Sequence, residues 1–314
     1  MARLSPSEVL LWIEKKRGGS SGLKGEKGNY LYLLPAILSC LFILIYPLIY
    51  NLQMSFREVT FVTLTRGGSP WTGLSNYRSI VHNPVFLRVL LNTMVFWLGS
   101  VAIQFVLGFL LALLFSKNFP LNYFYRALIL LPWFIPLTVS GTVFKWFFSG
   151  ETGLINSLLL GVGLINKPIP WLTSPRLAIY TATLANIWLG IPFNFIMLFT
   201  GLQAIPVELY ESAKVEGARE WQLVRYITVP LLKPTILLTL ILGSIFTIKV
   251  FDVVWVLTGG GPGDASHIFT TWAYSLAWQR FRFGEHASVV GVMMLFISLL
   301  GCLLLFARRH WRVE

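Results

Sequence analysis

The stretch Val89-LLNTMVFWLGSVAIQFVLGFLLALL-Phe115 contains no charged residue over its whole length. A helix needs about 20 mostly apolar residues to cross the hydrocarbon core of a bilayer, so this stretch is long enough to span one. Further stretches qualify in the same way, and together they predict six spans: Leu31–Tyr50, Val89–Phe115, Ala127–Phe148, Leu177–Leu202, Pro234–Leu257 and Ala287–Phe306. We therefore expect an all-α fold, a polytopic transmembrane helical bundle with six spans.

The composition agrees with this fold class. Of the 314 residues, 55% are hydrophobic and only 12% are charged, whereas soluble globular chains carry about 25% charged residues. Continuous apolar runs of this length, without alternation of polar and apolar residues, exclude a transmembrane β-barrel. Cys40 and Cys302 lie within apolar runs and have no neighbouring ligand pattern, so we expect them to be inert thiols.

The distribution of charge matters more than the net charge of +12. If the N-terminus is cytoplasmic, the cytoplasmic segments hold more Lys and Arg than the opposite side, spread over fewer residues. The positive-inside rule then predicts that both termini lie in the cytoplasm. The basic residues therefore indicate contact with membrane lipid, and no nucleic-acid partner is expected.

The domain organisation predicted from the sequence has three parts. Residues 1–28 form a cytoplasmic segment, either a short interfacial helix or a frayed tail, followed by a flexible linker rich in Gly and Ser. Residues 29–309 form the membrane domain, and residues 310–314 form a cytoplasmic tail.

A polar stretch separates the fourth and fifth apolar runs, Glu211-SAKVEGAREWQLVRYITV-Pro230. The spans and their predicted orientation put it on the cytoplasmic side, within a loop that covers residues 206–230. Pro206 is suited to the start of a helix, and Gly217 allows the backbone to turn or a partner to come close. We expect one helix from about Pro206 to Gly217, a bend, and a second helix that continues into Pro230.

This loop resembles the EAA loop in the membrane subunits of binding-protein-dependent ABC importers. The family pattern is Glu-Ala-Ala, three residues, Gly, nine residues, then Ile-x-Leu-Pro. The matching positions are Glu211, Ala213, Gly217, Ile227 and Pro230, while Ser212 replaces the second alanine and Val229 the leucine. Thr258-Gly-Gly-Gly-Pro262, after Phe251-Asp252, also resembles the sugar-importer branch of this family. The resemblance extends from roughly Tyr30 to Arg309.

The resemblance implies a fold like that of a type I ABC importer permease, in which the loop docks into an ATPase subunit. It assigns this coupling to Glu211, Ser212, Ala213, Glu216, Gly217, Ile227 and Pro230. It also implies a second permease subunit, two copies of an ABC ATPase subunit, an extracytoplasmic solute-binding protein, and a location in the bacterial cytoplasmic (inner) membrane.

Bond chemistry is not expected from this chain. It has no Gly-x-x-x-x-Gly-Lys-Ser/Thr motif for ATP phosphates, and its four His residues are scattered without metal-ligand spacing. We therefore predict a non-enzymatic subunit with no cofactor and no metal of its own, with ATP and Mg bound by the partner ATPase.

The fourth and fifth spans leave the loop in opposite directions, so residues about thirty before and thirty after Gly217 should lie at similar depth. Amide and aromatic side chains on the fourth span suit a sugar, either a mono- or an oligosaccharide. The resemblance to the maltose-type members implies that their sugar contacts correspond to residues of this chain, and Lys249 is included because it is a charge within an apolar run. The predicted substrate path is Asn186, Trp188, Gly190, Phe193, Gly243, Thr247, Lys249 and Val250.

Lys249 and Asp252 are the charges deep in an otherwise neutral run, where a charge costs about 2.5–3.5 kcal/mol on insertion scales. On one helix face the two would neutralise each other; alternatively, Lys249 meets an anionic or hydroxyl-rich substrate. The same fold could carry a phosphorylated polyol such as glycerol-3-phosphate. An ATP-independent secondary transporter is the other alternative, but such folds usually show internal repeats and more buried ionisable residues.

Overall fold

The computed structural model describes residues 32–310. The expected N-terminal segment 1–28 and all but the first residue of the 310–314 tail lie outside the described residues. Within residues 32–310 the regular structure is helical, apart from two isolated β-bridges, Arg57–Trp71 and Thr60–Arg282. The chain divides into two compact units, Met1–Gln53 and Met54–Glu314, which are described separately.

The first unit contributes most of an apolar helix that runs from Tyr32 to Ser55. This helix contains a π-helical turn, η1 (Leu41–Ile45), followed by α3 (Tyr46–Ser55). Tyr46 stacks on Tyr50 with ring centroids 6.2 Å apart. The first predicted span therefore coincides with a continuous helix that is long enough to cross a bilayer.

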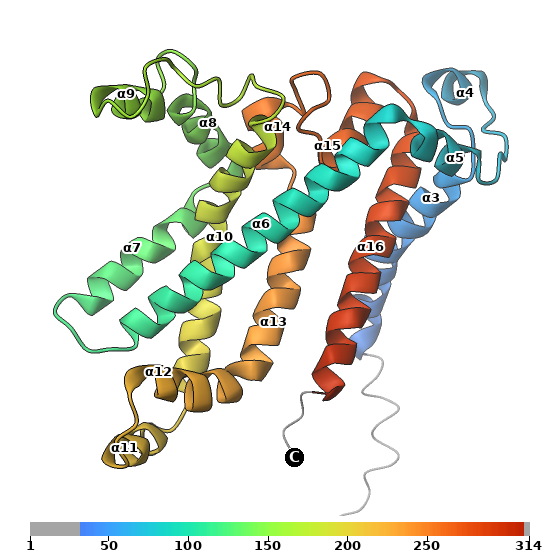
Figure 1. Ribbon diagram of the computed structural model, residues 1–314. Coiled ribbons are helices and arrows are strands. Elements are labelled where there is room, and N and C mark those ends of the chain that lie inside the picture. The colour runs from blue at the N-terminus through green and yellow to red at the C-terminus, as the bar shows by residue number, and fades with distance from the viewer. Residues whose placement is uncertain (1–31, 311–314) are drawn as a thin grey trace, which may run out of the picture. The chain divides into compact units, whose positions relative to one another are not determined.

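Four long helices dominate the second unit: α6 (Pro84–Phe115), α10 (Ala178–Gln203), α13 (Val229–Ile248) and α16 (Phe283–His310). Helix α10 packs against α6 and α13 (Figure 1). Polar side chains join α6 to α10: the Asn186 amide donates to Ser100 Oγ at 2.9 Å, and Gln104 donates to the Asn186 carbonyl at 2.8 Å. Such pairing is required inside an apolar bundle, because no water is present to satisfy these groups.

The predicted span Ala127–Phe148 is wrong as a single helix. It consists of α7 (Asn122–Phe134) and α8 (Leu137–Phe147), which meet at an angle of 97°. Pro136 disfavours the helical conformation of the residue before it, and Ile135 is extended at φ −85°, ψ 128°. Among the described residues, five helices are long and apolar enough to cross a membrane, or six if this bent pair counts as one span.

The predicted span Pro234–Leu257 is also interrupted. Helix α13 ends at Ile248, and α14 (Asp252–Thr258) begins after three non-helical residues. The Thr270 hydroxyl donates to the Val250 carbonyl at 2.6 Å and so satisfies a backbone group that the break leaves free. The expectation that Lys249 and Asp252 share one helix face is therefore wrong, because the break between α13 and α14 lies between them.

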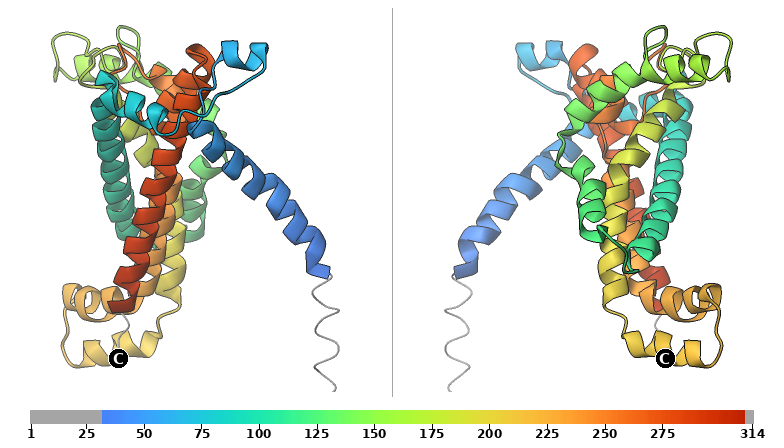
Figure 2. Two further views of the ribbon diagram at one scale, coloured as in Figure 1. Left: turned by 90° about the vertical axis from the view of Figure 1, so that its right-hand side faces the viewer. Right: turned by 90° about the vertical axis from the view of Figure 1, so that its left-hand side faces the viewer.

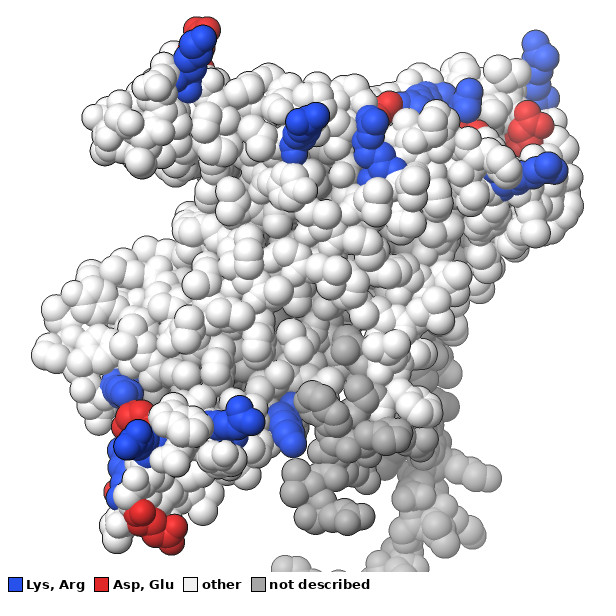
Figure 3. Space-filling view, in the orientation of Figure 1, with Lys and Arg blue, Asp and Glu red and all other residues white. Residues whose placement is uncertain are grey.

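The second unit has two distinct ends. At one end lie α11 (Val207–Val215), α12 (Glu220–Leu223) and the π-helical turn η2 (Val224–Thr228), which project beyond the long helices (Figures 1 and 2). At the other lie α4 (Phe61–Arg66), α5 (Ser75–His82), α9 (Leu154–Gly161), α15 (Phe269–Tyr274) and η3 (Ser275–Gln279). On the face shown in Figure 3, charged side chains gather at these ends and leave a neutral band between them. This pattern is typical of a protein that crosses a membrane.

Candidate functional site

The loop between α10 and α13 begins with helix α11, whose end is closed by a Schellman motif. Gly217 has φ +85°, its N–H donates to the Lys214 carbonyl at 3.0 Å, and the Ala218 N–H donates to the Ala213 carbonyl at 2.9 Å. A residue in this left-handed conformation is normally glycine, because other side chains are strained there. The motif accounts for the fixed spacing between Ala213 and Gly217.

The second helix of the loop is continuous with the membrane-crossing helix. Residues Glu220–Ile248 form one helical segment that includes α12, η2 and α13. Ile227 lies in η2, and Pro230 lies inside this continuous segment, at the start of α13, where its missing N–H removes one backbone hydrogen bond. The prediction of two helices with a bend between them is confirmed, and the second helix extends far beyond Pro230.

Contacts between α11 and the second helix hold the loop together. The Tyr210 hydroxyl lies 3.0 Å from the Thr228 hydroxyl, which itself donates to the Leu223 carbonyl inside the π-helical turn. Glu220 lies 3.1 Å from Lys117, at the end of α6, and 3.9 Å from Lys214 of α11. The exposed ion pairs thus join the loop to the chain just after α6, and Tyr210 joins α11 to η2.

The outer face of the loop is exposed and carries apolar side chains. No residue of α11 is buried, and Glu211, Ser212, Glu216 and Gly217 are all exposed. Val215 is 89% exposed, and Trp221 and Tyr226 are also open. Large apolar side chains on a projecting element are typical of a protein–protein interface. The residues predicted for coupling therefore lie together on one short, accessible segment, with Ala213, Ile227 and Pro230 half-buried along its inner side.

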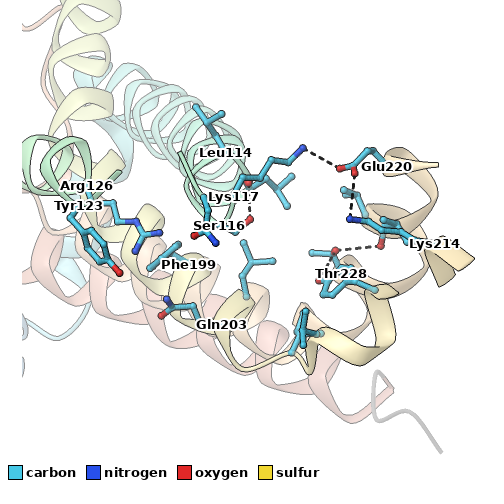
Figure 4. A pocket seen from close by; sticks show the side chains of 18 residues that line it. Leu114, Ser116, Lys117, Tyr123, Arg126, Phe199, Gln203, Lys214, Glu220 and Thr228 are labelled. Carbon is cyan, nitrogen blue, oxygen red and sulfur yellow. Dashed lines mark hydrogen bonds and ion pairs between the residues drawn. The ribbon is translucent and has the colours of Figure 1, made fainter. Parts of the chain in front are cut away.

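Beside this loop lies a pocket of about 760 Å³, which we call the loop-end pocket. It is bounded by the end of α6, the start of α7, the end of α10 and the loop (Figure 4). Arg126, Tyr123 and Phe199 lie on one side of it, and Glu220 and Lys214 lie on the other. Its lining combines apolar and basic side chains: Leu113, Leu114, Ser116, Lys117, Asn118, Tyr123, Arg126, Phe199, Leu202, Gln203, Ile205, Val207, Tyr210, Lys214, Glu220, Leu223, Val224 and Thr228.

The residues predicted for the substrate path separate into two groups. Asn186 is only 5% exposed and donates to Ser100 of α6. A Cβ atom added to Gly190 would lie 2.3 Å from the Gln104 side chain, so Gly190 provides space for α6. Thr247 and Gly243 are also buried. Asn186 and Gly190 thus join α10 to α6, and their contact with substrate stays a prediction.

The other group lies in two clusters of aromatic side chains. Trp188 is 39% exposed and makes an edge contact with Phe144 at 5.4 Å. Phe193 contacts Phe246 of α13 at 5.3 Å, and Lys249 Nζ lies 5.1 Å from the centre of the Phe246 ring. Trp188 and Phe144 form one cluster, and Trp133, Phe193 and Phe246, with Lys249 at the edge, form the other; no ring contact joins the two clusters within residues 32–310. We call the two clusters together the aromatic surface. Val250 is half-buried at the break that follows.

Lys249 is exposed within this unit, and no ion pair within 4 Å joins it to Asp252 in the described part of the chain. The break between α13 and α14 separates the two side chains. The cation instead lies over an aromatic ring, which provides a modest attraction of about 0.5–1 kcal/mol at an exposed site.

At the opposite end of the unit, a buried histidine holds the connection between α14 and α15. His267 Nε2 lies 3.3 Å from Asp264, and Asp264 lies 3.2 Å from Arg280. Burial lowers the pKa of His267 below its ordinary value, although the Asp264 carboxylate opposes that shift. Its ring also occupies the space that a side chain at Gly260 would need.

Several of these contacts could not be identified from sequence patterns. Lys117, Gln104 and Phe246 belong to no motif, and each acts through a partner that is distant in the chain. For Tyr210, spacing on the predicted helix gave no indication of a partner on η2. Within residues 32–310, no three His, Cys, Asp or Glu side chains are grouped as metal ligands would be.

Comparison with known proteins gives a consistent result. Residues 104–311 match the family described as "Binding-protein-dependent transport system inner membrane component". The chain is 34% identical over 261 residues to the trehalose/maltose transport system permease protein of Thermococcus litoralis, covering 83% of this chain and 85% of that protein. It is 32% identical over 290 residues to the lactose transport system permease protein of Rhizobium radiobacter, covering 91% and 95%.

Solved structures show the same fold. A chain of a bacterial alginate ABC transporter, in complex with an alginate pentasaccharide-bound periplasmic protein, superposes with a TM-score of 0.79 at 24% identity. That match covers 93% of this chain and 98% of the other. A chain of a bacterial ABC transporter involved in the import of the acidic polysaccharide alginate gives a TM-score of 0.72 at 26% identity, with coverage of 96% and 98%.

Proposed function

The chain belongs to the family of binding-protein-dependent transport system inner membrane components, and from that membership we propose that it is the permease subunit of an ATP-driven sugar importer. Maltose- and lactose-type transport proteins among its relatives support a sugar, either a mono- or an oligosaccharide, as the cargo. The single observation that carries the proposal is the projecting loop, with exposed apolar side chains on a helix closed at Gly217.

In this proposal the loop faces the cytoplasm, both termini lie on that side, and α11 docks into an ATPase subunit. A second permease subunit completes the path, two ATPase copies bind ATP and Mg, and an extracytoplasmic binding protein delivers the sugar. Closure of the ATPase pair on ATP moves α11, and the contacts of Glu220 with Lys117 and of Tyr210 with Thr228 transmit the motion to α6 and η2. The permease pair then alternates between two arrangements of its interface.

The aromatic surface is the part of the chain best suited to the sugar. Aromatic faces cover the apolar side of a sugar ring, and ligand sites combine such walls with a few polar groups. Trp188, Phe193 and Lys249 retain their predicted roles here. The contacts of Asn186, Gly190, Gly243, Thr247 and Val250 with the sugar stay predictions; a Cβ atom on Gly243 would lie 3.9 Å from the Phe193 ring.

One observation favours a second cargo, a phosphorylated polyol such as glycerol-3-phosphate. Lys249 is an exposed cation between apolar helices, and no carboxylate pairs with it among residues 32–310. A charge at that depth is costly without a partner, and a phosphate would neutralise it. Lys249→Met would then abolish uptake of the anion, whereas it would leave uptake of a neutral sugar within a few-fold of its original rate.

A pull-down of the tagged chain in mild detergent, followed by mass spectrometry and uptake assays in proteoliposomes, tests the proposal. Recovery of an ABC ATPase and a second permease, with ATP-dependent uptake of a sugar, is the expected result. Recovery of the chain alone, with uptake that needs no ATP, would instead establish the secondary transporter.

A further inference from the structure

We propose that the loop-end pocket binds one anionic phospholipid, with the lipid phosphate between Arg126 and Lys117. The inference rests on the proposed function only in placing this end of the molecule in the cytoplasmic leaflet. The ligand is defined by its chemistry: a phosphate with net negative charge joined to acyl chains.

The depth of the pocket suits a lipid headgroup. Its walls are the places where three apolar helices begin or end: α6 ends at Phe115, α7 begins at Asn122 and α10 ends at Gln203. Apolar spans end where the hydrocarbon core gives way to the headgroup region. A volume of about 760 Å³ lies in the range of pockets that enclose small organic ligands.

Arg126 is the group that lacks a partner of opposite charge. Its guanidinium lies 4.2 Å from the Phe199 ring centre and 5.4 Å from that of Tyr123, and Nη2 donates to the Phe115 carbonyl. Its Nε–H is buried and has no hydrogen-bond partner. No carboxylate forms an ion pair with it within the described residues. A half-buried guanidinium is best stabilised by a phosphate or carboxylate, because its donors match their oxygens in pairs.

The charge balance of the lining also favours an anion. The charged side chains are Lys117, Arg126 and Lys214 against Glu220 alone, which is three positive and one negative and leaves a net charge of +2. Glu220 lies with Lys117 and Lys214, on the other side of the pocket from Arg126 (Figure 4). Basic pockets between membrane helices at the cytoplasmic side are typical sites for anionic headgroups.

The apolar part of the lining decides between a lipid and a soluble anion. Leu113 and Leu114 on α6 line the pocket beside the basic groups, and Leu114 is 53% exposed, whereas Phe199 and Leu202 on α10 are already buried. A free phosphate would contact only the basic groups and would leave the exposed surface of Leu114 in water. Acyl chains would cover it, and burial of apolar surface favours them by about 25 cal/mol per Å².

The test uses the intact complex in nanodiscs that contain equal amounts of phosphatidylcholine and phosphatidylglycerol. After transfer to mild detergent, native mass spectrometry counts the lipids that remain bound. Wild type should retain one phosphatidylglycerol per chain in preference to phosphatidylcholine. Arg126→Gln and Lys117→Gln should each reduce this retention about tenfold, as expected for loss of a charge-assisted hydrogen bond to phosphate.

Two further variants make the comparison sharper. Arg126→Lys keeps the charge and should restore part of the preference. Arg225→Gln removes the same charge from an exposed residue that does not line the pocket and should retain lipid like wild type. Lys117 is exposed, so Lys117→Gln gives a result even if Arg126→Gln fails to fold.

Equal retention of both lipids by wild type, or unchanged retention by both Gln variants, would overturn the inference. So would displacement of the lipid by millimolar inorganic phosphate, because the site would then recognise the free anion. Bound lipid is counted by mass and not by transport. Absence of an ATPase from the complex would therefore contradict the proposed function and leave the lipid result intact.

Discussion

Replacement of Gly217 by valine tests whether the shape of the loop is needed for transport. Gly217 has φ +85°, and no atom lies within 4 Å of the position that a Cβ would occupy. The substitution therefore meets no neighbour, and its cost comes from the backbone alone. Gly217→Asn is the matched control, because asparagine adopts the left-handed conformation more readily than other residues with side chains.

The size of the effect follows from the Schellman motif. A left-handed conformation costs a residue with a side chain roughly 1–2 kcal/mol. The two hydrogen bonds of the motif, to the carbonyls of Ala213 and Lys214, contribute about 1 kcal/mol each. The backbone strain of valine is thus close to the energy of the two hydrogen bonds. A loss of about 1–2 kcal/mol should raise the fraction of molecules in which the end of α11 is unfolded by about 5- to 30-fold.

Two measurements follow this change. Hydrogen exchange of the peptide 207–222 should accelerate in Gly217→Val, while exchange in α10 and α13 should stay the same. Uptake and substrate-stimulated ATP hydrolysis should fall sharply in Gly217→Val and remain near wild type in Gly217→Asn. If valine and asparagine give the same exchange and the same uptake, the conformation at this position does not matter and the reasoning is refuted.

Other substitutions have equally specific outcomes. Tyr210→Phe removes the hydrogen bond to Thr228, so uptake should fall while melting temperature changes little; an unaffected rate would mean that this contact transmits nothing. Asn186→Leu removes the hydrogen bond to Ser100 Oγ, although the backbone carbonyl at position 186 still accepts from Gln104, and it should cost about 1–3 kcal/mol of stability. Trp188→Ala should mainly raise the KM of uptake. The reverse pattern in melting and uptake assays would contradict the division between a packing residue and a substrate residue. Burial lowers the pKa of His267 in the folded protein below its ordinary value of 6.5. As the pH falls through 6.5, His267 therefore gains a proton more readily in the unfolded chain, and the free energy of unfolding should decrease. His267→Gln should weaken this decline in thermal unfolding at pH 7.5 and 5.5, and an unchanged pH dependence would exclude His267 as its source.

The positions of the long helices could be predicted from the sequence, because the length of an apolar run is enough to mark a span. The predicted span Leu177–Leu202 and helix α10 differ by a single residue at each end. Interruptions could not be predicted in the same way. A proline within a membrane helix can be tolerated, as Pro192 is in α10, or can end the helix, as Pro136 does. The difference depends on which neighbouring groups satisfy the freed backbone.

The shape of the loop between α10 and α13 was predictable because its motif is local. The turn at Gly217 needs only the backbone bonds to Ala213 and Lys214, which are close in sequence. The substrate path was less predictable, because equal depth in the membrane does not determine which way a side chain faces. Asn186 and Trp188 are two positions apart on α10, yet one contacts α6 and the other is open.

The central claim is that α11 docks into an ATPase, and a photo-crosslinker at Val215, the most exposed apolar position of that helix, tests it most directly. A crosslinker at Leu164, an exposed residue of the connection between α9 and α10, serves as the control. Illumination of the intact complex should join position 215 to an ABC ATPase subunit, with a yield that changes when ATP is added, and should give no such product from position 164. If position 215 yields no adduct with an ATPase in the intact complex, the loop does not dock there and the account is wrong.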